Sequence, residues 1–287
     1  MLINEALNTI AKGIANLYNH NESLNIAKIA VKHILKINNL ELSLSLNNVF
    51  PNEDIEKLFF ILKRLKESCP IQYITSESYF LDLCLQVNES VLIPRPETEE
   101  LVNWLINSQK PAGNKTLRVL DIATGSGCIA IAIKKYLPQT DVYACDISNA
   151  ALDVARENAE INETNIDFFE ADVLSPEFYN LLPHNSFDII ISNPPYVRFS
   201  EKKFMHNNVL NYEPEIALFV RDNDPLIFYN AISKVSKKLL NTQGELYLEI
   251  NENFSSEICC ILEEKNFKNI VIENDIFDKP RMAKAIR

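Results

Sequence analysis

The spacing of apolar residues changes twice along the chain. Over residues 1–70 they recur every three to four positions, which is the period of a helix that buries one face. Two such faces are present, made by Ile26, Ile29, Ala30, Ile34 and Leu35, and by Ile55, Leu58, Phe59, Leu62 and Leu65. Asn21 or Ser23 suits the start of the first helix, and Pro70 follows the second. We expect a small helical domain over residues 1–70.

Residues 71–93 alternate apolar and polar side chains, which predicts a β-hairpin linker. From Leu117 onward, short apolar runs alternate with helical patterns. Strands are predicted at 117–122, 141–145, 166–170, 187–192, 245–250 and 269–273, and helices near 127–136, 148–160, 224–240 and 253–265. Asp224-Pro225 favours a helix start, and residues 282–287 suit an added edge strand. Strands that alternate with helices predict an α/β, Rossmann-like, mostly parallel sheet within a larger domain at 94–287.

Length and composition agree with one large and one small globular domain. The chain has 287 residues, 47% hydrophobic and 23% charged. No apolar run approaches the roughly 18 residues that span a membrane, and the N-terminus lacks the basic region of a signal peptide. Six cysteines without a C-x-x-C pair and four scattered histidines predict no metal site. We expect reduced thiols in a cytoplasmic protein.

The formal charge of −11 argues against a duplex nucleic acid as the partner. Proteins that hold duplex DNA usually present a basic face to the phosphates. Lys234, Lys237 and Lys238 offer only a local basic patch. The excess of acidic over basic residues favours a protein or small-molecule substrate, with no direct contact to nucleic acid.

The most informative chemistry lies at residues 193–196, N-P-P-Y, which follow the apolar run 188–192. Two prolines force the chain out of the strand in an extended shape. Asn193 and the carbonyl of Pro194 then offer acceptors, and Tyr196 offers a stacking face beside them. Such a site suits a planar group that carries an NH2, which is either an amide or an exocyclic amine.

A second motif, residues 121–127 with the sequence D-I-A-T-G-S-G, joins the first predicted strand to a helix. Glycine permits a tight turn and close approach of a ligand, and the helix directs its N-terminal amides to the same place. The loop formed by Ala123, Thr124, Gly125, Ser126 and Gly127 is therefore a candidate cofactor site. A plain strand-to-helix turn is the alternative interpretation.

Acidic residues follow the next two strands. Asp146 stands where doubly wound folds bind a ribose diol, although a turn or cap before Ser148 explains it too. Asp172 suits the amino group of an adenine, and Val173 suits its ring, while a cap again explains Asp172 alone. The loop matches neither G-x-G-x-x-G nor a phosphate-binding loop. An adenosyl ligand without phosphates fits better, and S-adenosylmethionine is the obvious one.

Together these motifs resemble class I S-adenosylmethionine-dependent methyltransferases that modify planar nitrogens, with a seven-stranded sheet. More narrowly, the chain resembles the PrmC/HemK family of release factor glutamine N5-methyltransferases. The specific segments are P-I-Q-Y-I at 70–74, V-L-I-P-R-P-E-T-E at 91–99, E-P-E-I-A-L at 213–218 and K-P-R-M at 279–282. The resemblance covers residues 22–287. Ala123 and Ser76 depart from it, because the family commonly has glycine at both positions.

The resemblance implies methyl transfer to the glutamine amide in the G-G-Q tripeptide of class 1 peptide chain release factors, which modulates translation termination. The product would be S-adenosylhomocysteine, and the enzyme would be a cytoplasmic monomer. The resemblance assigns cofactor binding to residues 123–127, Asp146, Asp172, Val173 and Asn193. It assigns catalysis to Asn193, Pro194 and Tyr196, and substrate binding to these and Pro195. The helical domain 1–70 would help to recognise the protein substrate.

Two questions stay open at this point. Arg95, Glu97 and Thr98 precede or begin a helix, so they form either a helix N-terminus or a lid over the site. An N6-adenine methyltransferase is the rival function, because an adenine amine resembles a glutamine amide. The acidic charge and the segment at 94–99 favour glutamine. A non-enzymatic nucleotide-binding or scaffold protein is disfavoured by the intact motifs.

Overall fold

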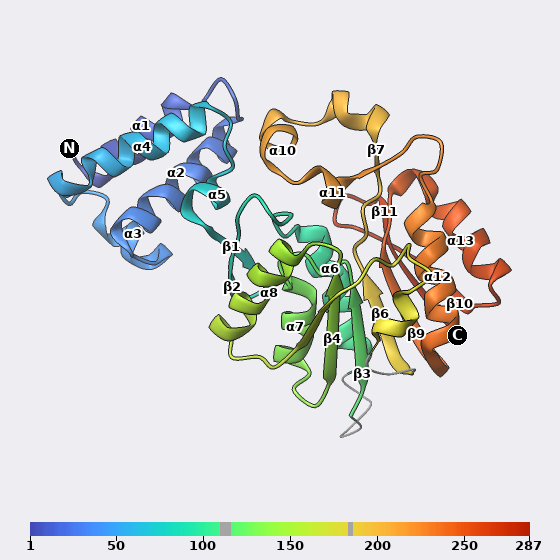
Figure 1. Ribbon diagram of the computed structural model, residues 1–287. Helices are drawn as coiled ribbons and strands as arrows, with labels where there is room; N and C mark the ends of the chain where they lie inside the picture. Colours follow the sequence, from blue (N-terminus) through green and yellow to red (C-terminus); the bar gives the residue numbers. More distant parts are fainter. Residues whose placement is uncertain (110–115, 183–185) are drawn as a thin grey trace. The chain divides into compact units, whose positions relative to one another are not determined.

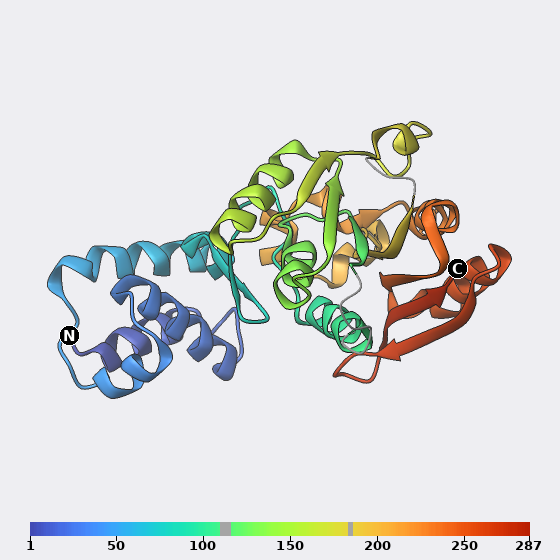
Figure 2. The same cartoon turned by 90° about the horizontal axis from the view of Figure 1, so that it is seen from below.

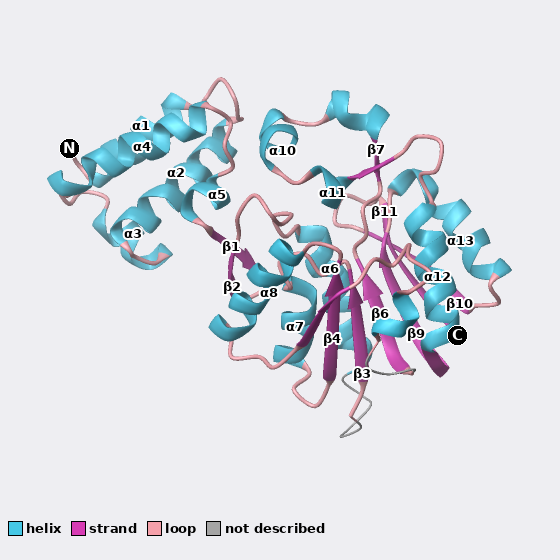
Figure 3. Cartoon of the chain, viewed as in Figure 1, coloured by secondary structure: helices cyan, strands magenta, loops and turns pink. Residues whose placement is uncertain are grey.

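The computed structural model describes residues 1–109, 116–182 and 186–287 (Figure 1). The chain divides into two compact units. Unit 1 consists of Met1–Glu77 together with His206–Tyr212, and unit 2 consists of Ser78–Met205 together with Glu213–Arg287. Figure 3 shows that unit 1 is helical and that unit 2 carries the large sheet.

Unit 1 is a helical bundle around one apolar core. Its helices are α1 (Ile3–Gly13), α2 (His20–Leu35), α3 (Asn39–Ser45), α4 (Ile55–Lys66), α5 (Ile71–Thr75) and α10 (Asn207–Tyr212), with a 3-10 turn, η1, at Asn52–Asp54. Helix α2 begins after Asn19, whose side chain accepts from the amide of Glu22, and not after Asn21 or Ser23. Ile26 and Ala30 are buried as predicted, but Ile29 is 36% exposed because it lies off the buried stripe of α2.

Two local features of unit 1 differ from the sequence pattern. Residues 71–75 form the short helix α5, whose N-cap is Pro70, and do not form a strand. The hairpin therefore starts only at β1 (Glu77–Phe80) and ends with β2 (Leu83–Gln86). The segment His206–Tyr212 is far along the chain yet belongs to unit 1. There the hydroxyl of Tyr212 donates to the carbonyl of Glu67 at 3.0 Å.

Unit 2 is built on the predicted seven-stranded, mostly parallel sheet. The strand order is β10-β11-β9-β6-β3-β4-β5. The strands are β3 (Arg118–Ile122), β4 (Asp141–Asp146), β5 (Asp167–Glu170), β6 (Phe187–Ser192), β9 (Leu240–Glu249), β10 (Lys268–Asn274) and β11 (Pro280–Ile286). Strands β5, β4, β3, β6 and β9 are parallel, and β11 is antiparallel to both of its neighbours. The direction of winding reverses between β3 and β6, which is where open α/β sheets bind ligands.

Two expectations for this unit were wrong. The C-terminal strand β11 is not an edge strand, because it inserts between β9 and β10, and its Met282, Ala283 and Ala285 are buried. The helix expected from Asp224-Pro225 starts later, at Ile227. The amide of Asp224 instead donates to the carbonyl of Arg221 within a turn.

Helices cover both faces of the sheet (Figures 1 and 2). The helices are α6 (Pro96–Gln109), α7 (Cys128–Tyr136) and α8 (Asn149–Ile161) on one face, and α9 (Phe178–Leu181), α12 (Ile227–Leu239) and α13 (Ser255–Glu264) on the other. Strand β6 shows the period of two directly, because Ile189 and Ile191 enter one core and Ile190 the other. Shorter elements are β7 (Val197–Arg198), β8 (Phe219–Val220), α11 (Glu215–Leu218) and the 3-10 helices η3 (Phe199–Phe204) and η4 (Glu252–Phe254).

Candidate functional site

The register of the parallel strands brings the predicted motifs to one edge of the sheet. Ile122, which ends β3, is paired with Cys145 of β4 and with Ser192 of β6. The hydroxyl of Ser192 also donates to the carbonyl of Ile122 at 2.6 Å. The glycine loop, Asp146 and Asn193 therefore leave three adjacent strands at the same end.

The loop between β3 and α7 is held by several hydrogen bonds. The hydroxyl of Thr124 donates to Asp121 Oδ2 at 2.6 Å, and the amide of Gly127 donates to the carbonyl of Thr124 at 2.9 Å. Gly127 has φ +81°, and a Cβ built there would lie 3.1 Å from the Cβ of Ala155. This glycine thus serves close packing of the loop on α8. A Cβ on Gly125 (φ +55°) would meet no atom within 4 Å, so that position opens outward.

Ala123 adopts a left-handed backbone, with φ 62°. Glycine is the residue that takes this conformation without steric cost. Ser76, the other position where the family commonly has glycine, also has a positive φ of 58°. At both positions the chain therefore carries a Cβ on a left-handed backbone, a region that costs such a residue strain.

Asp146 makes the turn contacts that the sequence allowed as one of two interpretations. Its Oδ2 accepts from the amide of Gly125 and its Oδ1 from the amide of Ser148, each at 2.9 Å. It is therefore a turn-forming residue that also ties β4 to the glycine loop. Each carboxylate oxygen has a second lone pair, so capacity for further donors remains. Burial raises the pKa of Asp146, against the effect of the backbone donors.

Asp172 and Val173 follow β5 in the same region. Asp172 Oδ1 accepts from the amide of Leu174 at 2.8 Å, which is the local cap that the sequence also allowed. Both residues line the cavity described below.

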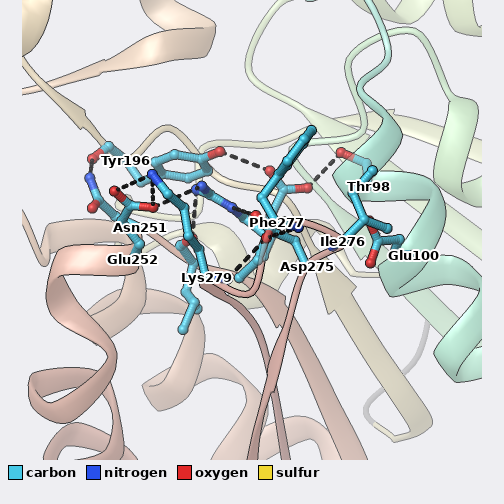
Figure 4. Close-up of polar contacts among 12 residues, drawn as sticks. Thr98, Glu100, Tyr196, Asn251, Glu252, Asp275, Ile276, Phe277 and Lys279 are labelled. Atoms are coloured by element: carbon cyan, nitrogen blue, oxygen red, sulfur yellow. Dashed lines mark hydrogen bonds and ion pairs between the residues drawn. The ribbon is translucent and has the colours of Figure 1, made fainter.

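Asn193 is held by a chain of hydrogen bonds that ends on a buried carboxylate. Its Nδ2 donates to Thr98 Oγ1 at 3.0 Å, and that hydroxyl donates to Glu249 Oε2 at 2.5 Å. The hydroxyl of Tyr196 donates to the other carboxylate oxygen, Glu249 Oε1, at 2.8 Å. Figure 4 shows the bonds that leave Thr98 and Tyr196. The N-P-P-Y segment after β6, the end of β9 and the start of helix α6 thus meet at Glu249.

Glu249 is unusual for a glutamate, because it is only 1% exposed to solvent. Burial raises its pKa, while the hydrogen bonds from Thr98 and Tyr196 and the charge of Arg281 act in the opposite direction. Arg281 is held in turn by Asp275, at 3.4 Å, at the turn between β10 and β11. Burial and the nearby charge of Glu249 raise the pKa of Tyr196 well above its usual value, so its hydroxyl stays protonated and donates.

Asn193 and Thr98 line a cavity of about 310 Å³ in unit 2. The predicted residues that line it are Ala123, Thr124, Gly125, Ser126, Asp146, Asp172, Val173, Asn193 and Pro195. Gly127, Pro194 and Tyr196 lie outside this lining, where Gly127 packs on α8 and Tyr196 bonds to Glu249. The cavity thus brings the glycine loop and the N-P-P-Y segment to one space.

The ionisable groups of the cavity disfavour an anionic ligand. Two carboxylates, Asp146 and Asp172, line it together with one guanidinium, Arg95. That guanidinium already bonds to Glu213 at 2.6 Å. Phosphate groups would meet repulsion here, whereas a cationic sulfonium and an ammonium would be attracted. Apolar walls from Ile147, Leu174 and Phe228 suit a flat ring. The residues present therefore fit S-adenosylmethionine better than a nucleotide phosphate.

Sequence reasoning missed two supporting carboxylates, Glu249 and Glu213. The signal for Glu249 was a charge within the otherwise apolar run at residues 246–250, where β9 ends. Glu213 was noted only as part of a resembling segment. It accepts from Arg95 and from the amide of Ile93, so it anchors the chain just before α6.

Across the residues that the structure describes, no cluster of three or more histidine, cysteine, aspartate or glutamate side chains is arranged to hold a metal ion. The same residues include no helix whose length and apolarity would let it cross a membrane.

Comparisons with known proteins match both units. Residues 5–75 match the PrmC N-terminal domain, and residues 99–212 match the Methyltransferase small domain. A release factor glutamine methyltransferase of Flavobacterium psychrophilum is 43% identical over 286 residues, which covers 99% of each chain. Another of that name, from Bacteroides thetaiotaomicron, is 42% identical over 82% of this chain and 81% of its own.

Solved structures share the fold at low identity. A methyltransferase from Pyrococcus furiosus superposes with a TM-score of 0.52 at 16% identity, covering 78% of this chain and 96% of the other. A 16S rRNA N2 G1207 methyltransferase of Thermus thermophilus gives 0.52 at 18% identity, covering 74% of this chain and 49% of the other. The predicted class I methyltransferase fold with an N-terminal helical domain is confirmed.

Proposed function

The chain belongs to the release factor glutamine methyltransferase family, and we propose that it methylates the glutamine amide in the G-G-Q tripeptide of class 1 peptide chain release factors. The family membership predicted from the sequence is thus confirmed. The observation that supports the reaction is the placement of Asn193 in the same cavity as the glycine loop and Asp146.

We assign the cofactor contacts to one side of this cavity. Asp146 would bind the ribose hydroxyls, Asp172 the adenine amine, and Val173 would pack on the ring. Residues 123–127 would hold the amino-acid end. When bound, S-adenosylmethionine supplies an activated methyl group on a positively charged sulfur.

The substrate contacts are assigned to the N-P-P-Y segment. An amide nitrogen is a poor nucleophile because its lone pair is delocalised into the carbonyl. Hydrogen bonds from its two N–H groups to Asn193 Oδ1 and to the carbonyl of Pro194 would favour positive charge on that nitrogen. They would also orient the nitrogen toward the methyl group. The methyl would pass from sulfur to nitrogen, S-adenosylhomocysteine would be left, and one N–H proton would be lost to solvent, so orientation and electrostatics carry the reaction without a strong general base. Pro195 and Tyr196 would wall the amide.

We further propose that one chain is sufficient and works without direct nucleic-acid contact. Every residue assigned to the site belongs to unit 2 of a single chain. Release factors act in the cytoplasm, where translation takes place, so the enzyme would work there. Unit 1 would help to recognise the protein substrate.

The test is incubation with labelled S-adenosylmethionine and either a release factor or duplex DNA, followed by mass spectrometry of both. We expect label on the G-G-Q glutamine and none on adenine. Asn193→Ala should abolish the label while cofactor binding, measured by calorimetry, is largely kept. Asn230→Ala, an exposed position on α12, is the matched control and should behave as wild type. Label on adenine alone would replace this proposal with the rival one.

A further inference from the structure

The side-chain amide of Asn193 has two similar orientations, and only one suits the proposed reaction. A half-turn about its last torsion exchanges Oδ1 and Nδ2 with little change in shape. Facing a substrate amide, Oδ1 accepts an N–H, whereas Nδ2 would bring one donor against another. Something in the protein must therefore select the orientation.

The chain of hydrogen bonds to Glu249 has a fixed direction. An ionised carboxylate only accepts, and Glu249 receives the hydroxyl protons of Thr98 and Tyr196. A threonine hydroxyl has one proton, so Thr98 has only lone pairs left for Asn193. The partner that Thr98 Oγ1 takes from Asn193 must then be a donor, which is Nδ2 at 3.0 Å.

The surroundings of Thr98 and Glu249 keep this series of hydrogen bonds in place. Thr98 is 2% exposed and Glu249 is 1% exposed, so water does not compete for these bonds. Thr98 lies in the first turn of α6, and Glu249 ends β9, so both sit on regular elements. The carbonyl of Glu249 also accepts from the hydroxyl of Tyr229 at 3.4 Å.

We propose that Glu249 and Thr98 are positioning residues that fix the Asn193 amide with Oδ1 toward the substrate. The proposal deepens the function given above and rests on it. Neither residue needs to touch the substrate amide. Glu249 sets the direction of the Thr98 hydroxyl, and Thr98 transmits that direction to Asn193.

Substitution of Thr98 separates the hydroxyl from the shape of the side chain. Thr98→Val keeps the volume but removes the acceptor, and Thr98→Ser keeps the hydroxyl. We expect Thr98→Val to lower kcat on the release factor by about 10- to 100-fold, less than loss of the contact itself. The Kd for the cofactor should change by less than about threefold, which is under 1 kcal/mol. Thr98→Ser should restore most of kcat.

The matched control is Thr140→Val. Thr140 is also 2% exposed, and its hydroxyl donates only to a backbone carbonyl, of Leu137, at 2.7 Å. It lies just before β4, at the opposite end of the sheet. We expect a similar loss of thermal stability and unchanged kcat. Equal kcat for Thr98→Val, Thr98→Ser and wild type would overturn the proposal.

Glu249→Gln tests the other residue with nearly the same shape. A glutamine must turn its NH2 toward either Thr98 or Tyr196, so one hydroxyl has to reverse its bond. We expect a loss of kcat with cofactor binding retained. Glu245→Gln, on the same strand, is the control, and its carboxylate pairs with Lys284 at 2.7 Å. A glutamine whose NH2 faces Tyr196 still accepts from Thr98, so kcat is compared with the Asn193 NH2 signals described below. Wild-type kcat in Glu249→Gln, together with Asn193 NH2 signals that no longer match wild type, would contradict a positioning role.

A readout without substrate separates this inference from the proposed function. The side-chain NH2 signals of Asn193, assigned by their loss in Asn193→Ala, are recorded by NMR on the full chain with cofactor. They should keep their shifts and slow exchange in Thr98→Ser and lose both in Thr98→Val. If wild type labels no release factor but this pattern holds, the substrate is wrong and the positioning stands. If labelling succeeds and the signals are the same in all variants, the positioning is wrong.

Discussion

The guanidinium of Arg95 bonds to the carboxylate of Glu213 at 2.6 Å across 118 residues of chain. The other oxygen of Glu213 accepts from the amide of Ile93 at 3.2 Å. Both residues belong to segments that the sequence singled out separately. Their contact fixes the segment that leads into α6. In the first turn of that helix, Thr98 bonds to Asn193 and Glu249.

Arg95→Met should destabilise the protein, because it leaves the Glu213 side chain, 1% exposed, without its cation. We expect the free energy of unfolding to fall by about 2–3 kcal/mol, somewhat less than for a fully buried pair, since Arg95 is itself 32% exposed. Urea denaturation followed by circular dichroism measures it.

Arg156→Met is the control for that experiment. Arg156 pairs with Asp153 at the surface, with 45% and 73% of the side chains exposed, so about 0.5 kcal/mol or less should be lost. Equal losses in the two variants would show that the Arg95–Glu213 bond contributes no more than a surface pair.

The local parts of the fold followed from sequence pattern because neighbouring residues determine them. The alternation in β6 separates Ile190 from Ile189 and Ile191, and the helix expected near 148–160 forms as α8. Asp146 and Asn193 were found because each directly follows an apolar strand. The cavity brings them together through the pairing of parallel strands, a feature that the fold class implies.

The missed features depend on contacts between distant parts of the chain. Periodicity describes which face of β11 is buried but not which strands flank it, so its internal place was not predicted. Glu249 meets Thr98 across 151 residues, and no local spacing encodes that bond. The placement of His206–Tyr212 in unit 1 is likewise a long-range contact.

Ala123→Gly should stabilise the protein. The left-handed backbone at φ 62° costs a residue with a Cβ about 1–2 kcal/mol, and the added chain entropy of glycine offsets about half of that. We expect a gain of up to about 1 kcal/mol in the free energy of unfolding, measured by urea denaturation.

Ala144→Gly, in the middle of β4, provides the comparison because its backbone is not left-handed. That change should destabilise the protein by about 1 kcal/mol or more. A loss of stability in both variants would mean that Ala123 is not strained by its conformation.

Asp146→Ala should weaken cofactor binding. It removes the proposed ribose acceptor and frees the amides of Gly125 and Ser148. Loss of hydrogen bonds to a charged group corresponds to about a 10- to 100-fold rise in Kd for S-adenosylhomocysteine, measured by calorimetry. Asp146→Asn keeps one acceptor oxygen and should lose less.

Asp141→Asn is the matched control, because Asp141 is exposed at the other end of the same strand. Its Kd should equal that of wild type. An unchanged Kd in Asp146→Ala would remove Asp146 from the ribose role.

Asp121 should make stability depend on pH, with a predictable sign. The carboxyl is fully buried, and burial raises its pKa from 3.8 to about 7, helped by the charge of Asp146 and opposed by the Thr124 hydrogen bond. The folded protein then binds this proton more tightly than the unfolded chain. Its contribution to stability is present below the unfolded pKa and is lost as pH rises toward about 7.

Asp121→Asn removes this titration while its amide oxygen still accepts from Thr124. The free energy of unfolding of the variant minus that of wild type should therefore rise with pH, by up to about 1.4 kcal/mol per pH unit. Above a pH of about 7 the difference should level off, because the wild-type carboxyl is then ionised in both states. Urea denaturation of both proteins between about pH 5 and about pH 8 measures it. The pH profile of Asn230→Ala, a change at an exposed position that carries no titratable group, should run parallel to that of wild type. A constant difference for Asp121→Asn across that range would show that the buried carboxyl does not hold its proton more tightly than an ordinary aspartate.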